Sequence, residues 1–198
     1  IILDKLSCSL AYENLIKSKI DISSQNDPIY KMKSIKNNIE IRNIIKSHIF
    51  DGVAVTKFLY WIKKYKKNIT ELAAVKKLEY FRKKNQNYLY PSFNTISASG
   101  SNGAIIHYRA TRSSNRLIKK KDIFLCDSGG QYKYGTTDIT RTMSLNKQTK
   151  KIKNIFTYVL KGHIAVASAN LNKIKRANLL DNLARKFLNK KGLDYPHG

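Results

Sequence analysis

Two aspartates near the middle of the chain, Asp127 and Asp138, are the residues whose type and spacing point most directly to chemistry. An apolar run of Ile, Phe, Leu and Cys leads into Asp127, glycines follow it, and a run rich in β-branched residues starts at Asp138. Both runs predict β-strands, and a glycine-containing connection lets such strands fold back on each other. We therefore expect a hairpin or meander that brings together two carboxylates eleven positions apart in sequence.

Two adjacent carboxylates repel each other unless one takes up a proton or a cation lies between them. Ligation by oxygen alone favours hard divalent ions such as Mn²⁺, Mg²⁺ or Ca²⁺. A pair of aspartates at this spacing is nevertheless a weak motif. Spacing alone favours the simpler interpretation, in which Asp127 starts a turn and Asp138 lies in a solvated loop.

The segments that must position these aspartates include several helices. Apolar residues at helical spacing predict a long helix over 37–66, and Thr70 is the expected N-cap of a second helix. Two later helices are expected over 148–169 and 177–190, the first with a buried apolar stripe. His48 and His163 adjoin these apolar faces, and we interpret both as packing residues.

Strand-like runs are expected at 92–99 and 104–108, separated by a turn over 100–103. His107 alternates with apolar neighbours in the second run, so we expect its ring on one face of that strand. Together, the order of helices and strands predicts an α+β fold with a largely antiparallel sheet.

The composition narrows the classes of partner. The chain has 198 residues and a formal net charge of +25, a balance that can indicate nucleic-acid binding. The lysines are, however, spread along the whole chain among Ile and Asn, without the interleaved aromatic residues of a platform for single strands. We therefore expect no specific nucleic-acid partner.

The lengths of the apolar runs and the number of cysteines predict the cellular setting. No apolar run is long enough to span a bilayer, so we expect no membrane association. The two cysteines, Cys8 and Cys126, do not suggest a disulfide framework, and a cytoplasmic location is the default. Because the chain starts at Ile1 and ends at Gly198 without an obvious tail, we interpret it as a fragment cut at both ends.

Several motifs together resemble one known family. The blocks SFNTISASGSNGAIIHYRAT (92–111) and CDSGGQYKYGTTDITRTMSL (126–145) resemble aminopeptidase P, the Xaa-Pro aminopeptidase family of pita-bread metallopeptidases, most closely its cytosolic-type members. Segments 156–169 and 179–198 continue the match in the same order. The resemblance covers about residue 32 to the end.

The resemblance implies a fold and a division into domains. Residues 32–198 would form an incomplete α+β pita-bread (creatinase/aminopeptidase-like) catalytic domain, truncated at its C-terminal end. Residues 1–31, whose composition differs from the rest, would be the tail of a preceding creatinase-like domain and a linker.

The family holds two metal ions, commonly Mn²⁺, with two Asp, one His and two Glu. Asp127 and Asp138 coincide with the two aspartate ligands, and Asp138 with the one that both metals share. The remaining His and two Glu are expected beyond Gly198, so the resemblance implies that the 198-residue chain alone is inactive.

The resemblance also assigns roles to three further residues. His107 coincides with a histidine near the metals that steadies substrate and transition state, and His197 with a histidine of the substrate site that is not a ligand. Thr140, beside Asp138, is expected to orient the carboxylate by a hydrogen bond.

The implied activity is that of an aminopeptidase. In the mechanism that the resemblance implies, a water or hydroxide held between two metal ions would attack the carbonyl before a proline at the second position of a peptide, which would release the N-terminal residue. The near alternative is prolidase, which cleaves Xaa-Pro dipeptides, and a third hypothesis is a non-catalytic pita-bread module that binds peptides or proteins. Because many relatives form dimers, a homodimer is the assembly that the resemblance suggests.

Overall fold

The computed structural model describes residues 1–65, 68–174 and 176–197. The chain divides into two compact units, Ile1–Lys46 and Ser47–Gly198, and we describe each by itself. The first unit contains β1 (Ile2–Leu3), α1 (Leu10–Lys17), β2 (Ser23–Ser24), α2 (Pro28–Ser34) and the start of α3 (Asn38–Lys64). Strands β1 and β2 pair in parallel.

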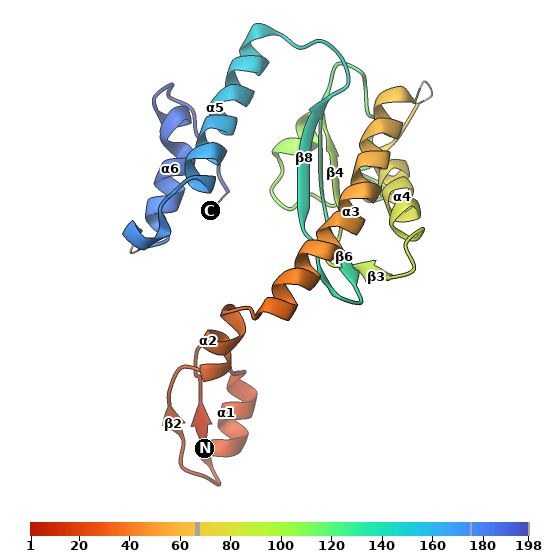
Figure 1. Ribbon diagram of the computed structural model, residues 1–198. Helices are drawn as coiled ribbons and strands as arrows, with labels where there is room; N and C mark the ends of the chain where they lie inside the picture. The colour runs from red at the N-terminus through yellow and green to blue at the C-terminus, as the bar shows by residue number, and fades with distance from the viewer. Residues whose placement is uncertain (66–67, 175, 198) are drawn as a thin grey trace. The chain divides into compact units, whose positions relative to one another are not determined.

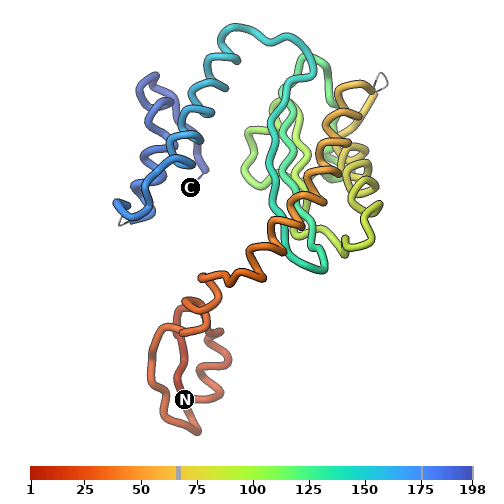
Figure 2. Tube along the Cα trace, in the orientation of Figure 1, coloured from red at the N-terminus to blue at the C-terminus, as the bar shows by residue number. Residues whose placement is uncertain are grey.

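The second unit contains the remainder of α3 and the elements that position the candidate site (Figures 1 and 2). In chain order these are α4 (Glu71–Arg82), β3 (Tyr88–Pro91), β4 (Ile96–Ser99), the 3₁₀ helix η1 (Gly100–Ala104), β5 (Ile123–Ser128), β6 (Gly130–Tyr132), β7 (Gly135–Thr136), β8 (Ile139–Ser144), α5 (Lys150–Ala167), the 3₁₀ helix η2 (Leu171–Lys173) and α6 (Asn178–Asn189).

Two small antiparallel sheets organise this unit. The first has the order β4-β5-β8, and the second, β3-β6-β7, is built largely from the connection between β5 and β8. The expected pairing of the two strands around the aspartates is therefore confirmed, because β5 and β8 form an antiparallel ladder from Ile123–Ser144 to Ser128–Ile139.

Alternation along β5 separates the hydrophobic core from the opposite face of the sheet. Phe124, Cys126 and Ser128 are buried, whereas the residues between them are only half-buried. The buried side packs under α3 and α4, which lie along one face of the sheet in Figure 1. The core cluster consists of Val55, Phe58, Ile62, Ile69, Ala74, Leu78, Phe124 and Cys126. Asp127 consequently points away from the core.

The predicted helices are all present. Thr70 caps α4 as expected, since its Oγ1 accepts a hydrogen bond from the backbone N–H of Ala73 at 3.2 Å. Helix α3 exposes Ile41 and Ile45 near its start. The residues that it buries are Ser47, Asp51, Ala54, Val55, Phe58 and Ile62. Within the described residues, none of the helices combines the length and the apolar character needed to cross a membrane.

Two local predictions were wrong. The apolar stripe of α5 is not buried, because α5 packs mainly against α6 and leaves Phe156, Val159 and Ile164 about half exposed. Residues 104–108 do not form a strand either. Their backbone N–H groups bond locally within the turn that follows η1, as in the bond from the Tyr108 N–H to the Ile105 carbonyl at 3.2 Å.

Candidate active site

One row across the sheet places Asp127 between a residue of β4 and a residue of β8. Ile96 lies opposite Asp127 on one side, and Thr140 lies opposite it on the other. The three residues belong to the face turned away from the core, so their side chains line the same open surface.

Thr140 holds the carboxylate of Asp127. Its Oγ1 donates a hydrogen bond to Asp127 Oδ1 at 2.7 Å. The sequence led us to expect Thr140 to orient a carboxylate because Asp138 lies near it, but the hydrogen bond that forms goes across the ladder to Asp127. This difference arises because antiparallel pairing places Thr140 directly opposite Asp127.

Asp138 lies immediately before β8 and close to Asp127. Although Asp138 is an exposed residue, the surrounding protein removes part of the water from its carboxyl group. This partial desolvation, together with the charge of Asp127 and a hydrogen bond between the two carboxyl groups, raises the pKa of Asp138, whereas the charge of His48 lowers it. The two carboxylates that the sequence paired are therefore adjacent, and a cation between them would relieve their repulsion.

His107 is presented by a strained turn. Its φ of 51° is the one positive value among the described non-glycine residues, and the imidazole is exposed. The next residue fixes this turn: the Tyr108 hydroxyl is within 2.8 Å of Glu71 Oε2, and the buried Glu71 also accepts from the Ser99 N–H at 2.7 Å.

His197, at the C-terminal end of the described chain, lies beside His107. The rings of His107 and His197 meet edge to face with their centroids 5.2 Å apart. Arg185 of α6 anchors the segment that carries His197, donating to Asp194 Oδ1 at 2.7 Å, to the Tyr195 carbonyl at 2.6 Å and to the His197 carbonyl. The guanidinium also lies 4.1 Å from the centre of the Tyr195 ring.

These side chains line one pocket of about 540 Å³. Asp127, Thr140, His107 and His197 are all among its lining residues, and Asp138 lies next to Asp127 without lining the pocket itself. The structure thus brings together a carboxylate pair and two imidazoles from four separate segments of the sequence.

The donor set fits a hard divalent cation but is incomplete. Two adjacent carboxylate groups suit Mn²⁺ or Mg²⁺, since a cation between them would offset the repulsion that contributes, after desolvation, to the raised pKa of Asp138. Within the described residues, no group of three or more His, Cys, Asp or Glu side chains could hold a metal ion. Further ligands are needed to complete a metal site.

Sequence reasoning missed the buried polar residues behind this pocket, namely Asp51, Glu71 and Arg82, each with at most 1% of its surface exposed. Glu71 is in the first turn of α4, where an acidic residue is usually explained by its favourable interaction with the helix dipole alone. Asp51 gave a clearer signal, because it is an acidic residue four positions before Val55 on the face that the helix buries.

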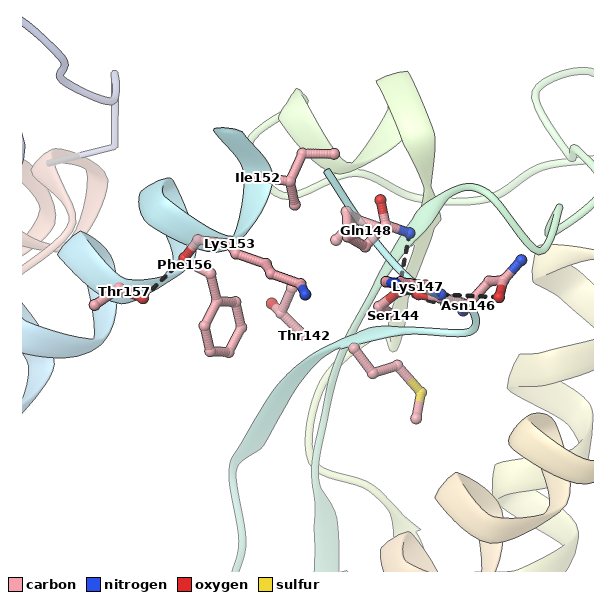
Figure 3. Close-up of a pocket in the computed structure, with 11 residues that line it drawn as sticks. Thr142, Ser144, Asn146, Lys147, Gln148, Ile152, Lys153, Phe156 and Thr157 are labelled. Atoms are coloured by element: carbon pink, nitrogen blue, oxygen red, sulfur yellow. Dashed lines mark hydrogen bonds between the residues drawn. The ribbon is translucent and has the colours of Figure 1, made fainter. Parts of the chain in front are cut away.

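A separate pocket lies between the end of β8 and the start of α5 (Figure 3). It has a volume of about 430 Å³, and Gln148 and Ser144 on its wall are joined by a 2.9 Å hydrogen bond. None of the candidate site residues lines this pocket, so we assign it no part in the chemistry.

Aromatic and basic side chains do come together in space, although they are not interleaved along the sequence. The Lys77 ammonium lies 4.5 to 5.6 Å from the ring centres of Tyr80, Phe81 and Trp61. The sequence argument against a platform for nucleic acid therefore does not extend to the surface of α3 and α4.

Comparison with known proteins agrees with this geometry. The family model described as metallopeptidase family M24 matches residues 42–198. The Xaa-Pro aminopeptidase ApepP of Drosophila melanogaster is 44% identical over 174 residues, which cover 86% of this chain and 28% of that protein. The chain thus spans less than a third of the length of this relative.

Solved structures give the same result. The X-prolyl aminopeptidase of Caenorhabditis elegans, described as a cytosolic enzyme with a di-nuclear active site, superposes with a TM-score of 0.81 at 36% identity, covering 90% of this chain and 29% of that one. The prolidase of Pyrococcus furiosus superposes with a TM-score of 0.80 at 27% identity, covering 96% and 55%. The mixed helix and sheet arrangement is therefore part of a pita-bread fold.

Proposed function

This chain belongs to the metallopeptidase family M24, and from that premise we propose that it forms part of a Xaa-Pro aminopeptidase. The protein would release the N-terminal residue from peptides that have proline at the second position. The observation that carries this proposal is the adjacent pair Asp127 and Asp138 beside a pocket lined by two histidines.

We assign the metal ligands on this chain to Asp127 and Asp138. They would hold two divalent cations, most simply Mn²⁺, with Asp138 shared between them. One His and two Glu from outside this chain would complete the site, so the 198 residues alone are expected to be inactive. When bound, the cations supply an activated water and a positive charge for the substrate carbonyl.

The remaining side chains would act on the substrate. His107, exposed on its turn, donates a hydrogen bond to the oxygen on which negative charge develops. His197, 5.2 Å from it between ring centres, contacts the substrate without binding metal. Thr140 holds Asp127 so that one carboxylate oxygen stays directed toward the cation.

The proposed domain organisation follows from the sequence resemblance. Residues 32–198 would form the first part of the catalytic domain, and residues 1–31 the tail of a preceding creatinase-like domain. The identity of 44% to the Drosophila melanogaster aminopeptidase and of 36% to the Caenorhabditis elegans aminopeptidase, against 27% to the Pyrococcus furiosus prolidase, favours the aminopeptidase. A cytoplasmic location, a homodimer and the absence of a nucleic-acid partner belong to this proposal as well.

The test uses the full-length protein, loaded with Mn²⁺ after metal depletion. We expect it to cleave Xaa-Pro-Yaa peptides, and we expect Asp138→Asn to abolish measurable cleavage because both cations lose a shared ligand. Asp21→Asn, the same change at an exposed aspartate of the first unit, should leave the rate unchanged.

Two outcomes would contradict the proposal. Cleavage of Xaa-Pro dipeptides combined with inert longer peptides would identify a prolidase. Peptide binding without any Mn²⁺-dependent cleavage would identify a non-catalytic binding module.

A further inference from the structure

A buried ion pair lies directly behind the two candidate metal carboxylates. Arg82 Nε donates to Asp51 Oδ1 at 2.6 Å, and Arg82 Nη2 donates to Asp51 Oδ2 at 3.0 Å. The side chains are 1% and 0% exposed. Because removing a carboxylate and a guanidinium from water costs free energy, a pair this deeply buried must be satisfied by several hydrogen bonds.

Arg82 and Asp51 each bond to a residue that is next in sequence to one of the two candidate metal ligands. Arg82 Nη2 donates to the hydroxyl of Ser128, the residue after Asp127, at 3.0 Å. Asp51 Oδ2 accepts from the hydroxyl of Thr137, the residue before Asp138, at 2.5 Å. The Asp51–Arg82 pair therefore connects the two backbone segments that carry the carboxylates.

These two segments also touch each other at this point. The Thr137 N–H donates to the Gly130 carbonyl at 2.9 Å, and Thr137 Oγ1 accepts from the Gly130 N–H at 2.9 Å. Gly129 approaches so closely that an added Cβ would lie 2.0 Å from the Thr137 carbonyl oxygen. The hydroxyl of Thr137 is thus bonded on one side to Gly130, the first residue of β6 and three positions after Asp127, and on the other side to Asp51.

We propose that the Asp51–Arg82 pair is a positioning element that sets the separation of Asp127 and Asp138, and with it the affinity for divalent cations. This inference rests on the proposed function, since it assumes that the two carboxylates bind metal. The pair touches neither carboxylate; it acts through the hydroxyls of Ser128 and Thr137. An apolar pair of the same size could fill the space but could not tie the two segments together.

Substitution of Asp51 or Arg82 leaves an unpaired buried charge and risks loss of folding, so the test removes the links instead. Thr137→Val keeps the shape of the side chain and deletes the hydroxyl, while Thr137→Ser keeps the hydroxyl. Ser128→Ala deletes the contact with Arg82. The matched control is Tyr88→Phe, which deletes a 2.7 Å hydrogen bond to Glu79 in the same polar region without touching the pair.

The measurement is calorimetric titration of metal-depleted full-length protein with Mn²⁺, together with the melting temperature of each variant. Thr137→Val should weaken Mn²⁺ binding by about tenfold or more, as is common when a residue that orients ligands is removed, and Ser128→Ala should weaken it in the same direction. Thr137→Ser should restore the wild-type affinity, and Tyr88→Phe should lower the melting temperature without changing the affinity.

Two results would overturn the inference, and they are distinguishable. If Thr137→Val melts at a lower temperature but binds Mn²⁺ like the wild type, the pair only stabilises the fold. If the wild-type protein itself does not bind Mn²⁺, the proposed function fails and the positioning role fails with it.

Discussion

Asp127 and Thr140 are opposite residues of the β5–β8 ladder, and their side chains are joined by a 2.7 Å hydrogen bond on the face turned away from the core. The strand pairing that builds the sheet therefore also orients a candidate metal ligand. A shift of the ladder by one residue would turn Thr140 to the buried face and leave Asp127 without this partner.

Removal of that hydrogen bond should affect metal binding more than stability. In full-length protein we expect Thr140→Val to weaken Mn²⁺ binding by about tenfold, because Asp127 loses the donor that fixes its rotamer. Calorimetric titration measures the change. Thr140→Ser should retain the affinity, and Thr142→Val, the same substitution two residues along β8, should have no effect. If Thr140→Val and Thr142→Val lose the same amount of Mn²⁺ affinity, Thr140 has no specific role.

Gly129 should be intolerant of any side chain. A Cβ at this position would lie 2.0 Å from the Thr137 carbonyl oxygen and 2.2 Å from Ser92 Oγ, so Gly129→Ala must displace backbone. We expect a loss of about 2 kcal/mol or more in the free energy of unfolding, as for overpacked cores.

Gly52 of α3 offers the matched substitution. An added Cβ meets nothing within 4 Å there, and alanine favours the helix, so Gly52→Ala should gain about 0.5–1 kcal/mol. Chemical denaturation of both variants measures the two changes. If Gly129→Ala is as stable as the wild type, the backbone at Gly129 cannot lie so close to the Thr137 carbonyl that an added Cβ would clash with it.

The anchor of the His197 segment should be sensitive to acid. The hydrogen bond from Arg185, followed by that from the Tyr195 N–H, lowers the pKa of Asp194 below its ordinary value. Because the folded pKa is the lower one, the stabilising contribution of this contact is complete above the unfolded value and is lost as pH falls through the folded value.

Carboxyl-detected NMR titration follows Asp194 directly. We expect Arg185→Gln to raise the pKa of Asp194 toward its ordinary value. Lys186→Gln, which removes the same charge from the neighbouring position of α6, should change it little. If both substitutions shift the titration equally, the general positive charge and not the Arg185 contact causes the lowered pKa.

His107 should act on the rate of the reaction and not on substrate affinity. In full-length enzyme, His107→Ala should lower kcat by about 10²-fold with little change in KM, as when one donor to a developing oxyanion is removed. Steady-state kinetics with a Xaa-Pro-Yaa peptide measures both constants. His163, which the sequence predicted to be a packing residue, is exposed on α5, so His163→Ala should change neither constant. An increase in KM alone would assign His107 to substrate binding.

The sequence alone determined most of the local structure, and its resemblance to a known family gave the candidate ligands. The extents of α3, α5 and α6 were predicted to within about two residues at each end, and the start of α4 was predicted from its Thr70 cap, because these signals act between residues at most a few positions apart. The alternation of β5 and the two acidic positions beside the glycines likewise indicated paired strands with neighbouring carboxylates, and the ladder confirms the pairing.

Tertiary structure decided which polar residues support those carboxylates. The spacing on α3 places Asp51 on the buried face, but it does not identify Arg82, 31 positions away, as the partner that neutralises it. Glu71 likewise draws 104–108 into a turn that presents His107, and Thr140 bonds to Asp127 only because the strands pair in this register. In each case the deciding interaction joins residues far apart in sequence, so its energy appears only when the chain has folded.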